Sequence, residues 1–274
     1  MSYWNRLRLF RDHRIELAAA RIVTIAFLLL LLYPTSALAA PPLKVVFEHA
    51  LEASQRGDFS SALPLWDQVL AASPDDGAAW SNRGNVRLAL GDPEGAIVDQ
   101  TRAMELEPDN PDAHLNRGTA EELLQDWQSA AEDYGWILAR NPTDSDALYN
   151  LANVRGSEGD WAAAQSLFQR AMAARADFPM ARSAYALVVY QQGDLDLAEA
   201  ELRKLIRRHP MFADARAALS GLLWRQGFQG EAESHWAAAV GLDSRYRQAD
   251  WLLSVRRWPP QPTADLMTFL SLGS

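Results

Sequence analysis

A 34-residue repeat limits the fold of this 274-residue chain more than any other feature of its sequence. Starting at Leu43, the eighth place of every block is a small residue and the twentieth is alanine. Glycine fills the fifteenth place in five blocks, and proline fills the thirty-second in four. Such a chain is expected to stack one small structural unit many times. The blocks are residues 43–76, 77–110, 111–144, 145–178, 179–212 and 213–246.

Each repeated residue has a structural reason that points to two helices per block. Small residues at the eighth and twentieth places let two helices approach closely. Glycine at the fifteenth place favours the left-handed backbone that ends a helix, and Gln125 is the one departure from it. Proline at the thirty-second place stops the second helix, because it lacks the backbone N–H that a helix interior needs. The pattern therefore predicts an all-helical protein without strands.

This pattern resembles the tetratricopeptide repeat family over residues 43–246. The resemblance implies an all-α fold, a right-handed superhelix of six helix-turn-helix repeats with a C-terminal capping helix. It also implies a concave groove lined by the first helix of each repeat. The family serves mainly to bind proteins and peptides, so we expect a scaffold that is not an enzyme. The resemblance does not identify the partner.

Arginine at the seventh place of the second and third blocks departs from the family pattern, which has leucine there. The same two blocks carry aspartate at the twenty-third place, while the fourth block has leucine at both places. We therefore predict two structural ion pairs, Arg83 with Asp99 and Arg117 with Asp133. The alternative is that these arginines point into the groove and bind a carboxylate of the partner.

Polar residues recur on the side of the first helices that should face the groove. Asparagine fills the sixth place of three successive blocks, and a side-chain amide offers both a donor and an acceptor to the backbone of an extended peptide. The alternative is that these asparagines only tie neighbouring helices together. The candidate peptide-binding residues are Asn82, Asn85, Leu115, Asn116, Thr119, Tyr149, Asn150 and Asn153. Basic residues are rare on this predicted face, which favours a neutral or somewhat basic peptide with apolar side chains.

The first 39 residues differ in character from the repeats. Five arginines precede an apolar run and the small-residue sequence SALAA, which is the order typical of a secretory signal peptide. We therefore expect an exported protein. The alternative is an uncleaved membrane anchor, since residues 22–40 are just long enough to cross a bilayer. Mass spectrometry of the mature N-terminus distinguishes the two, because a start at residue 40 or 41 rejects the anchor.

Composition argues against several other functions. The chain has 26 basic and 35 acidic residues, of which five and two lie in the N-terminal segment, so the rest carries a net charge of about −12. Such a surface repels nucleic acid and anionic lipid. The absence of cysteine excludes disulfides, thiolate metal sites and cysteine nucleophiles. The five histidines lack metal-ligand spacing, and no phosphate-binding loop is evident, so we expect no catalytic residue, metal or cofactor.

The C-terminal tail is expected to close the superhelix. Residues 247–257 are predicted to form the capping helix, and residues 258–274 a proline-rich break with a short helix over 264–272. An apolar stripe of Leu266, Phe269 and Leu270 should fold back onto the capping helix. The alternative is that this stripe docks onto a partner or a membrane surface.

The sequence VRRWPP near the end, together with the repeated NRG, is similar to exported tetratricopeptide proteins of cyanobacteria and plastid lumens. This similarity favours a periplasmic or thylakoid-lumen location. It is compatible with an assembly factor for an envelope or thylakoid complex. The alternative function is a membrane-anchored organising protein that keeps its N-terminal helix and uses the groove as a tether.

Overall fold

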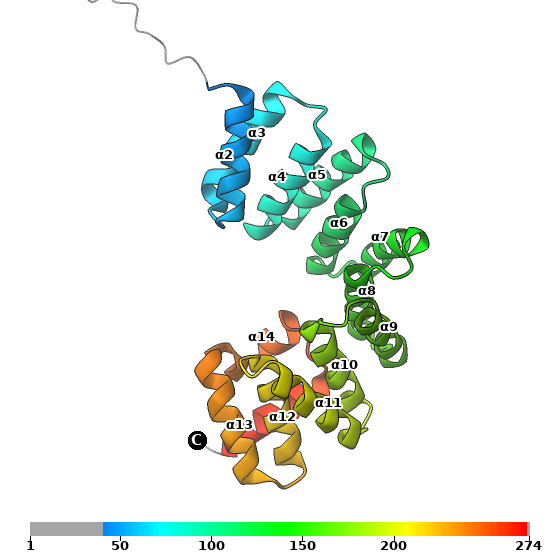
Figure 1. The fold of residues 1–274 in the computed structure, drawn as a ribbon, viewed down its shortest axis with the longest axis vertical. Helices are drawn as coiled ribbons and strands as arrows, with labels where there is room; N and C mark the ends of the chain where they lie inside the picture. Colours follow the sequence, from blue (N-terminus) through cyan, green and yellow to red (C-terminus); the bar gives the residue numbers. More distant parts are fainter. Residues whose placement is uncertain (1–40, 273–274) are drawn as a thin grey trace, which may run out of the picture. The chain divides into compact units, whose positions relative to one another are not determined.

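The computed structural model describes residues 41–272, so the predicted signal segment 1–39 lies outside the described residues. The chain falls into two units with a boundary after Val46, and the helical repeats lie in the unit from Phe47 onward, apart from the first residues of the first helix. Within the described range all regular secondary structure is helical, which confirms the all-α prediction (Figure 1). None of the described helices has the length and apolar character needed to cross a membrane.

Twelve helices form six successive pairs, and corresponding helices of neighbouring pairs start 34 residues apart. The first helices are α2 (Leu43–Gln55), α4 (Gly77–Ala89), α6 (Pro111–Leu123), α8 (Ser145–Ser157), α10 (Pro179–Gln191) and α12 (Ala213–Arg225). The second helices are α3 (Phe59–Ala72), α5 (Pro93–Leu106), α7 (Trp127–Arg140), α9 (Trp161–Ala174), α11 (Leu195–Arg208) and α13 (Gln229–Leu242).

The turn inside each pair depends on a left-handed residue followed by a capping aspartate. Five glycines at this place have φ between 75° and 92°. Gln125 takes the same conformation with φ 60°, at a cost of roughly 1 to 2 kcal/mol for a residue with a Cβ. The next residue caps the second helix, as when Asp92 accepts the Gly95 N–H at 2.9 Å. The sixth pair has Phe228 there and no side-chain cap.

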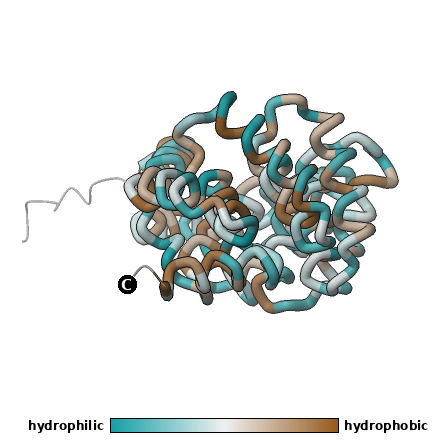
Figure 2. Tube along the Cα trace, turned by 90° about the horizontal axis from the view of Figure 1, so that it is seen from below, coloured by the Kyte–Doolittle hydropathy of each residue, from teal (hydrophilic) through white to brown (hydrophobic). Residues whose placement is uncertain are grey.

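The pairs stack so that the first helices form one row. Helices α5, α7, α9 and α11 each pack between their own first helix and the next one, while α4 contacts α6, α6 contacts α8, and α10 contacts α12. Small residues make this approach possible, since a Cβ on Gly118 would lie 2.8 Å from the Tyr134 ring. Figure 2 shows apolar and polar residues alternating along the same helices, as stacked amphipathic pairs require. This is the predicted superhelix of stacked helix pairs.

The interior changes character along the superhelix. The largest apolar core lies in repeats four to six and the tail, and it includes Phe168, Leu202, Leu222 and Leu266. Repeats two and three instead bury polar side chains. Those that are at most 7% exposed there are Asp99, Gln100, His114, Glu121, Glu122 and Asp133.

The tail differs from the predicted capping helix over 247–257. It forms a 3-10 turn (Ser244–Arg247), the short helix α14 (Ala249–Ser254), and then helix α15 (Pro260–Leu272). Arg257 has φ 54°, which no α-helix allows, so the expected helix cannot continue through this residue. Pro260 and Pro262 lie at the start of α15 and do not break the chain before it. A helix tolerates proline in its first turn, where the N–H has no partner within the helix. The short helix therefore begins at Pro260 and not at 264.

Helix α15 lies on the first helices of repeats five and six rather than mainly on α14. Its most extensive contacts are with α12, and smaller ones are with α10 and α14. A Cβ on Gly221 would come within 3.1 Å of the Leu266 backbone, so α12 and α15 are in close contact. Leu266 is fully buried, and Phe269 packs edge-to-face on Trp236. The apolar stripe is thus part of the core.

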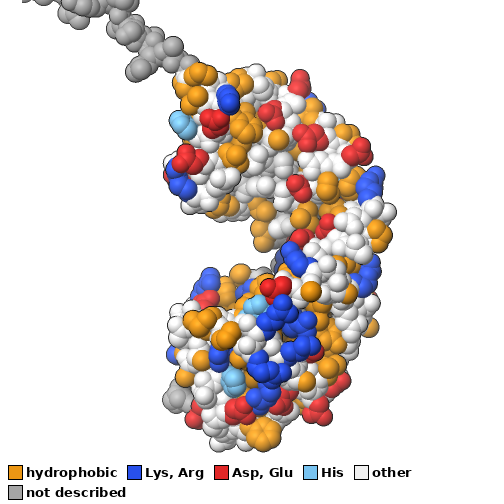
Figure 3. Space-filling view, viewed as in Figure 1, with side chains coloured by type: hydrophobic (Ala, Val, Ile, Leu, Met, Phe, Trp, Pro, Cys, Tyr) orange, Lys and Arg blue, Asp and Glu red, His pale blue; other side chains and the backbone are white. Residues whose placement is uncertain are grey.

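Basic side chains gather on one face of the described chain (Figure 3). Helix α11 contributes Arg203, Lys204, Arg207 and Arg208. Arg203 is paired with Glu199 and Glu231, and Arg208 lies 3.4 Å from Asp177. This cluster is on a second helix, outside the row of first helices.

Candidate functional site: the row of first helices and its C-terminal end

Arg83 lies between the two helices of repeat two and not in the open row. Its Nε and Nη2 donate to the two carboxylate oxygens of Asp99 at 2.8 and 2.7 Å. Nη1 donates to Asp67 of the preceding repeat at 2.8 Å, and Arg87 also donates to Asp99 at 3.0 Å. Asp99 is fully buried, and this contact raises the pKa of Arg83. The arginine therefore joins two repeats.

Repeat three has the corresponding pair with an added histidine. Arg117 donates through Nε and Nη2 to Asp133, both at 2.8 Å. His114 Nδ1 lies 2.7 Å from Asp133 Oδ1, and its ring stacks on Trp136 with 3.7 Å between centroids. These side chains are engaged with one another, so they are not free to bind a partner's carboxylate.

Glu121 lies beside this pair, with one oxygen 3.6 Å from Arg117 Nε. Burial and the charge of Asp133 together raise the pKa of Glu121 to about 7, although Arg117 acts in the opposite direction. The folded protein thus holds this proton more tightly than the unfolded chain, where a glutamate has a pKa of about 4.3. The stability that comes from neutral Glu121 is complete below about pH 4 and is lost as the pH rises through about 7.

We expect Glu121→Gln to remove this pH dependence. Near pH 4 the variant should match the wild type, and at about pH 8 it should be more stable by roughly 1 to 3 kcal/mol, because glutamine stays neutral. Urea unfolding at a series of pH values measures the difference. Asp109→Asn, which changes an exposed carboxylate in the loop before the same repeat that does not act on Glu121, is the control and should follow the wild-type curve. A constant offset for Glu121→Gln at all pH values would contradict the assignment.

Most of the predicted ladder residues have internal partners. Asn82 donates to the Ala78 carbonyl at 2.9 Å, and Asn85 accepts from Gln100 at 2.8 Å. Thr119 donates to the Leu115 carbonyl at 2.9 Å.

Two further asparagines act on neighbouring tyrosines. Burial raises the pKa of Tyr134 and of Tyr149, and against this larger effect Asn150 lowers the pKa of Tyr134 in the preceding repeat and Asn153 lowers that of Tyr149. Asn116 is half-buried and has no hydrogen bond from its side chain among the described residues. Two of the eight candidates, Tyr149 and Asn153, line the pocket described below.

Asp214 fixes the tail to the end of the row. It is 2% exposed, and its carboxylate accepts from Ser183 at 2.6 Å, Tyr246 at 2.9 Å and Trp258 Nε1 at 3.0 Å. Arg256 Nη2 lies 2.8 Å away as well. Burial alone would lower the pKa of Arg256, but the charge of Asp214 raises it above the ordinary value. One buried carboxylate therefore holds three parts of the tail.

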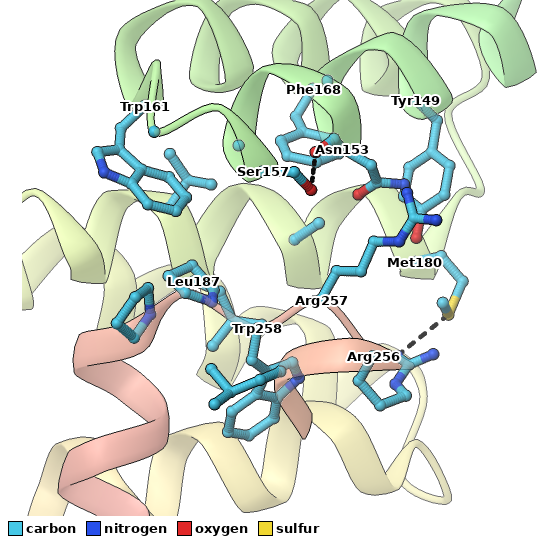
Figure 4. A pocket seen from close by; sticks show the side chains of 18 of the residues that line it. Tyr149, Asn153, Ser157, Trp161, Phe168, Met180, Leu187, Arg256, Arg257 and Trp258 are labelled. Atoms are coloured by element: carbon cyan, nitrogen blue, oxygen red, sulfur yellow. Dashed lines mark hydrogen bonds between the residues drawn. The ribbon is translucent and has the colours of Figure 1, made fainter. Parts of the chain in front are cut away.

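A pocket of about 320 Å³ lies between α8, α10 and the segment that leads into α15 (Figure 4). Trp161, Phe168 and Leu187 form apolar walls, while Arg257 and Trp258 close it from the tail. Arg257 reaches beyond the pocket to repeat three, where it pairs with Glu122 and lies 5.8 Å from the Trp127 ring. The described residues 41–272 contain no group of three acidic or histidine side chains that could hold a metal ion.

Sequence reasoning missed this end of the row. The predicted groove lacked basic residues, yet the tail brings Arg256 and Arg257 to it. A signal was present in the sequence. The twelfth place of the repeat is Glu122 in repeat three and Tyr190 in repeat five, but it is glycine, Gly156, in repeat four.

Comparison with known proteins agrees with this architecture. Two tetratricopeptide repeat family models match residues 47–111 and 157–223. None of the curated proteins matches the sequence. A tetratricopeptide repeat protein from Parabacteroides merdae superposes with a TM-score of 0.64 at 18% identity, covering 85% of this chain and 93% of that one. Pseudomonas aeruginosa pilF gives 0.63 at 16% identity, covering 74% and 92%.

A third solved structure is that of YrrB, described as a tetratricopeptide repeat protein with an unusual peptide-binding site. It superposes with a TM-score of 0.50 at 18% identity, covering 70% of this chain and 96% of that one. Such low identities establish the fold alone. Residues 47–111 and 157–223 are thus tetratricopeptide repeats, within a chain that has the tetratricopeptide superhelical fold.

Proposed function

We propose that this protein is a non-catalytic scaffold that binds an extended peptide segment of a partner protein along the first helices of repeats two to four. Tetratricopeptide repeats generally mediate protein–protein interactions, and YrrB is described as having a peptide-binding site. The observation that carries the proposal is where the row is covered: α15 lies on α10 and α12, whereas no described helix lies on α4, α6 and α8 in this way. The partner therefore has the first helices of repeats two to four available.

The polar residues of this open part support backbone recognition. Asn82, Asn116 and Asn150 are each half-buried, so their amides are partly open to solvent. Amide groups at successive repeats can exchange hydrogen bonds with a peptide backbone and read little of its sequence. The charge network of repeats two and three fixes the helices beneath them and is itself already satisfied. We therefore assign the arginines of that network to the scaffold.

Peptides enriched from a random displayed library on the full chain test this assignment. We expect a variant with Asn82, Asn116 and Asn150 all changed to alanine to bind them at least about tenfold more weakly, which corresponds to about 1.4 kcal/mol. Isothermal calorimetry measures the dissociation constants. A variant with Gln68, Gln128 and Gln229 changed to alanine removes three exposed amides from second helices and should bind as the wild type does. Failure to enrich any peptide, or equal binding by the asparagine variant, would reject the proposed function.

Export and the resulting location are part of the same proposal. The basic, apolar and small-residue order of the first 39 residues supports secretion, and the acidic remainder is compatible with a soluble mature protein. In a periplasm or thylakoid lumen such a scaffold would hold subunits during assembly of a membrane complex. The competing proposal, a tether with a retained N-terminal anchor, is decided by the mature N-terminus.

A further inference from the structure

The C-terminal segment runs past the ends of several first helices and contacts them at one repeated place. The twelfth place of the repeat is Glu122 in repeat three, and this side chain pairs with Arg257. In repeat five the same place is Tyr190, whose hydroxyl donates to Asp265 at 2.8 Å. Arg225 of repeat six also donates to Asp265, at 2.9 Å. The tail is therefore anchored on both sides of repeat four.

Repeat four has glycine at this place, and the pocket lies there. Gly156 contributes no side chain to fill the space between α8 and the tail. A Cβ built on it would meet the Trp161 ring at 3.4 Å, an ordinary contact distance, so the glycine is not required by close packing. Its backbone does not require glycine either, because Gly156 is absent from the residues with positive φ. The space of about 320 Å³ is large enough for a bulky side chain.

The chemistry of the lining favours an uncharged, apolar occupant. Trp161, Leu187 and Trp258 provide apolar surface, as Figure 4 shows. The basic groups near it do not call for an anion, since Arg256 is paired with Asp214, while Arg257 lies against Glu122 and burial lowers its pKa. Glu158 is likewise paired, with Arg155 at 2.7 Å. A charged ligand would have to compete with these pairs, whereas an aromatic or large aliphatic group would only displace water.

The tail holds the pocket in shape before a ligand arrives. Arg257 adopts φ 54°, an unfavourable backbone conformation for a residue with a side chain, and it directs its guanidinium across the opening (Figure 4). Trp258 is 3% exposed and is fixed by its bond to Asp214. A preformed wall lowers the ordering cost of binding.

We propose that this pocket binds one large uncharged apolar side chain of the peptide that runs along the open first helices, and that the C-terminal segment is therefore part of the binding site. This inference rests on the proposed function and adds the residue class that the peptide must carry. Asn153 lies at the mouth beside Tyr149 and is placed to bond the peptide backbone next to that side chain.

The test uses the full chain and two fluorinated probes, the neutral N-acetyl-4-fluorophenylalanine methylamide and the corresponding free acid. Fluorine NMR titration should show that the amide binds the wild type at least as tightly as the acid does. Gly156→Leu fills the pocket and should weaken the amide at least about tenfold. The matched control is Gly135→Leu on α7, where a Cβ meets nothing within 4 Å, and it should leave binding unchanged. If Gly156→Leu does not fold, Ala184→Leu fills the pocket from the opposite wall.

Three results would overturn the inference: no amide binding by the wild type, equal binding by the filled variant, or clearly tighter binding of the acid, which would indicate an anion site. Peptides enriched on the wild type separate this inference from the proposed function. Enriched peptides without a large apolar residue, or with equal affinity for Gly156→Leu, reject the pocket and leave peptide binding standing. Amide binding without any enriched peptide rejects the proposed function and leaves the pocket standing.

Discussion

Changing Asp133 to leucine is expected to lower the free energy of unfolding by about 3 to 5 kcal/mol. Asp133 is 2% exposed and accepts two hydrogen bonds from Arg117, with His114 a further 2.7 Å away. Leucine fills a similar space but accepts none of these bonds. Arg117 would then lose its paired carboxylate and keep only Thr101 and the more distant Glu121, and this lost pairing is the main source of the loss. Urea unfolding followed by circular dichroism measures it.

The double variant identifies the pairing. Arg117→Leu together with Asp133→Leu places leucine at both positions, as repeat four does with Leu151 and Leu167. We expect the double variant to be more stable than Asp133→Leu alone, with a coupling of about 1 to 3 kcal/mol. Glu132→Leu, next to Asp133 but exposed, controls for adding an apolar side chain. Additive losses would show that Arg117 and Asp133 stabilise the repeat independently.

The sequence was sufficient to predict features that recur in every repeat. Periodic alanine, glycine and proline determine where helices begin, end and approach each other, because these residues act through local sterics. The joint occurrence of arginine and aspartate in the same repeats predicted the ion pairs for a similar reason, since both partners occupy fixed places in one helix pair. Position within the repeat was thus enough to predict the contact between Arg83 and Asp99.

The packing of the tail could not be predicted in this way, because its contacts join residues that are far apart in the sequence. Arg257 meets Glu122, and Trp258 meets Asp214, so each contact joins the tail to a repeat far from it in the chain. No periodic pattern specifies such pairs. An apolar stripe on a short helix shows that the helix needs a partner surface, but many surfaces of a superhelix would satisfy that need. The pocket exists because the tail packs against this particular surface and because Gly156 leaves space there.

Asp214→Asn is expected to release the tail from the superhelix while changing almost no volume. The exchange removes the charge that compensates Arg256 and replaces one of the two oxygens that accept from Ser183, Tyr246 and Trp258 with an NH2 group, which cannot accept. Leaving a buried guanidinium without its partner costs about 3 to 5 kcal/mol, and each buried donor left unpaired adds to that cost.

Two measurements distinguish release of the tail from a general loss of stability. Hydrogen exchange should accelerate most in residues 249–272, and much less in the helices of repeats one to three, which have no hydrogen bond to the Asp214 carboxylate. The same variant should lose affinity for the neutral aromatic amide, because Trp258 and Arg257 form one wall of its pocket. Asp250→Asn makes the same exchange on the exposed side of α14 and should change neither result. If Asp214→Asn accelerates exchange uniformly along the chain, the tail is an ordinary part of the core, and its separate role in shaping the site is wrong.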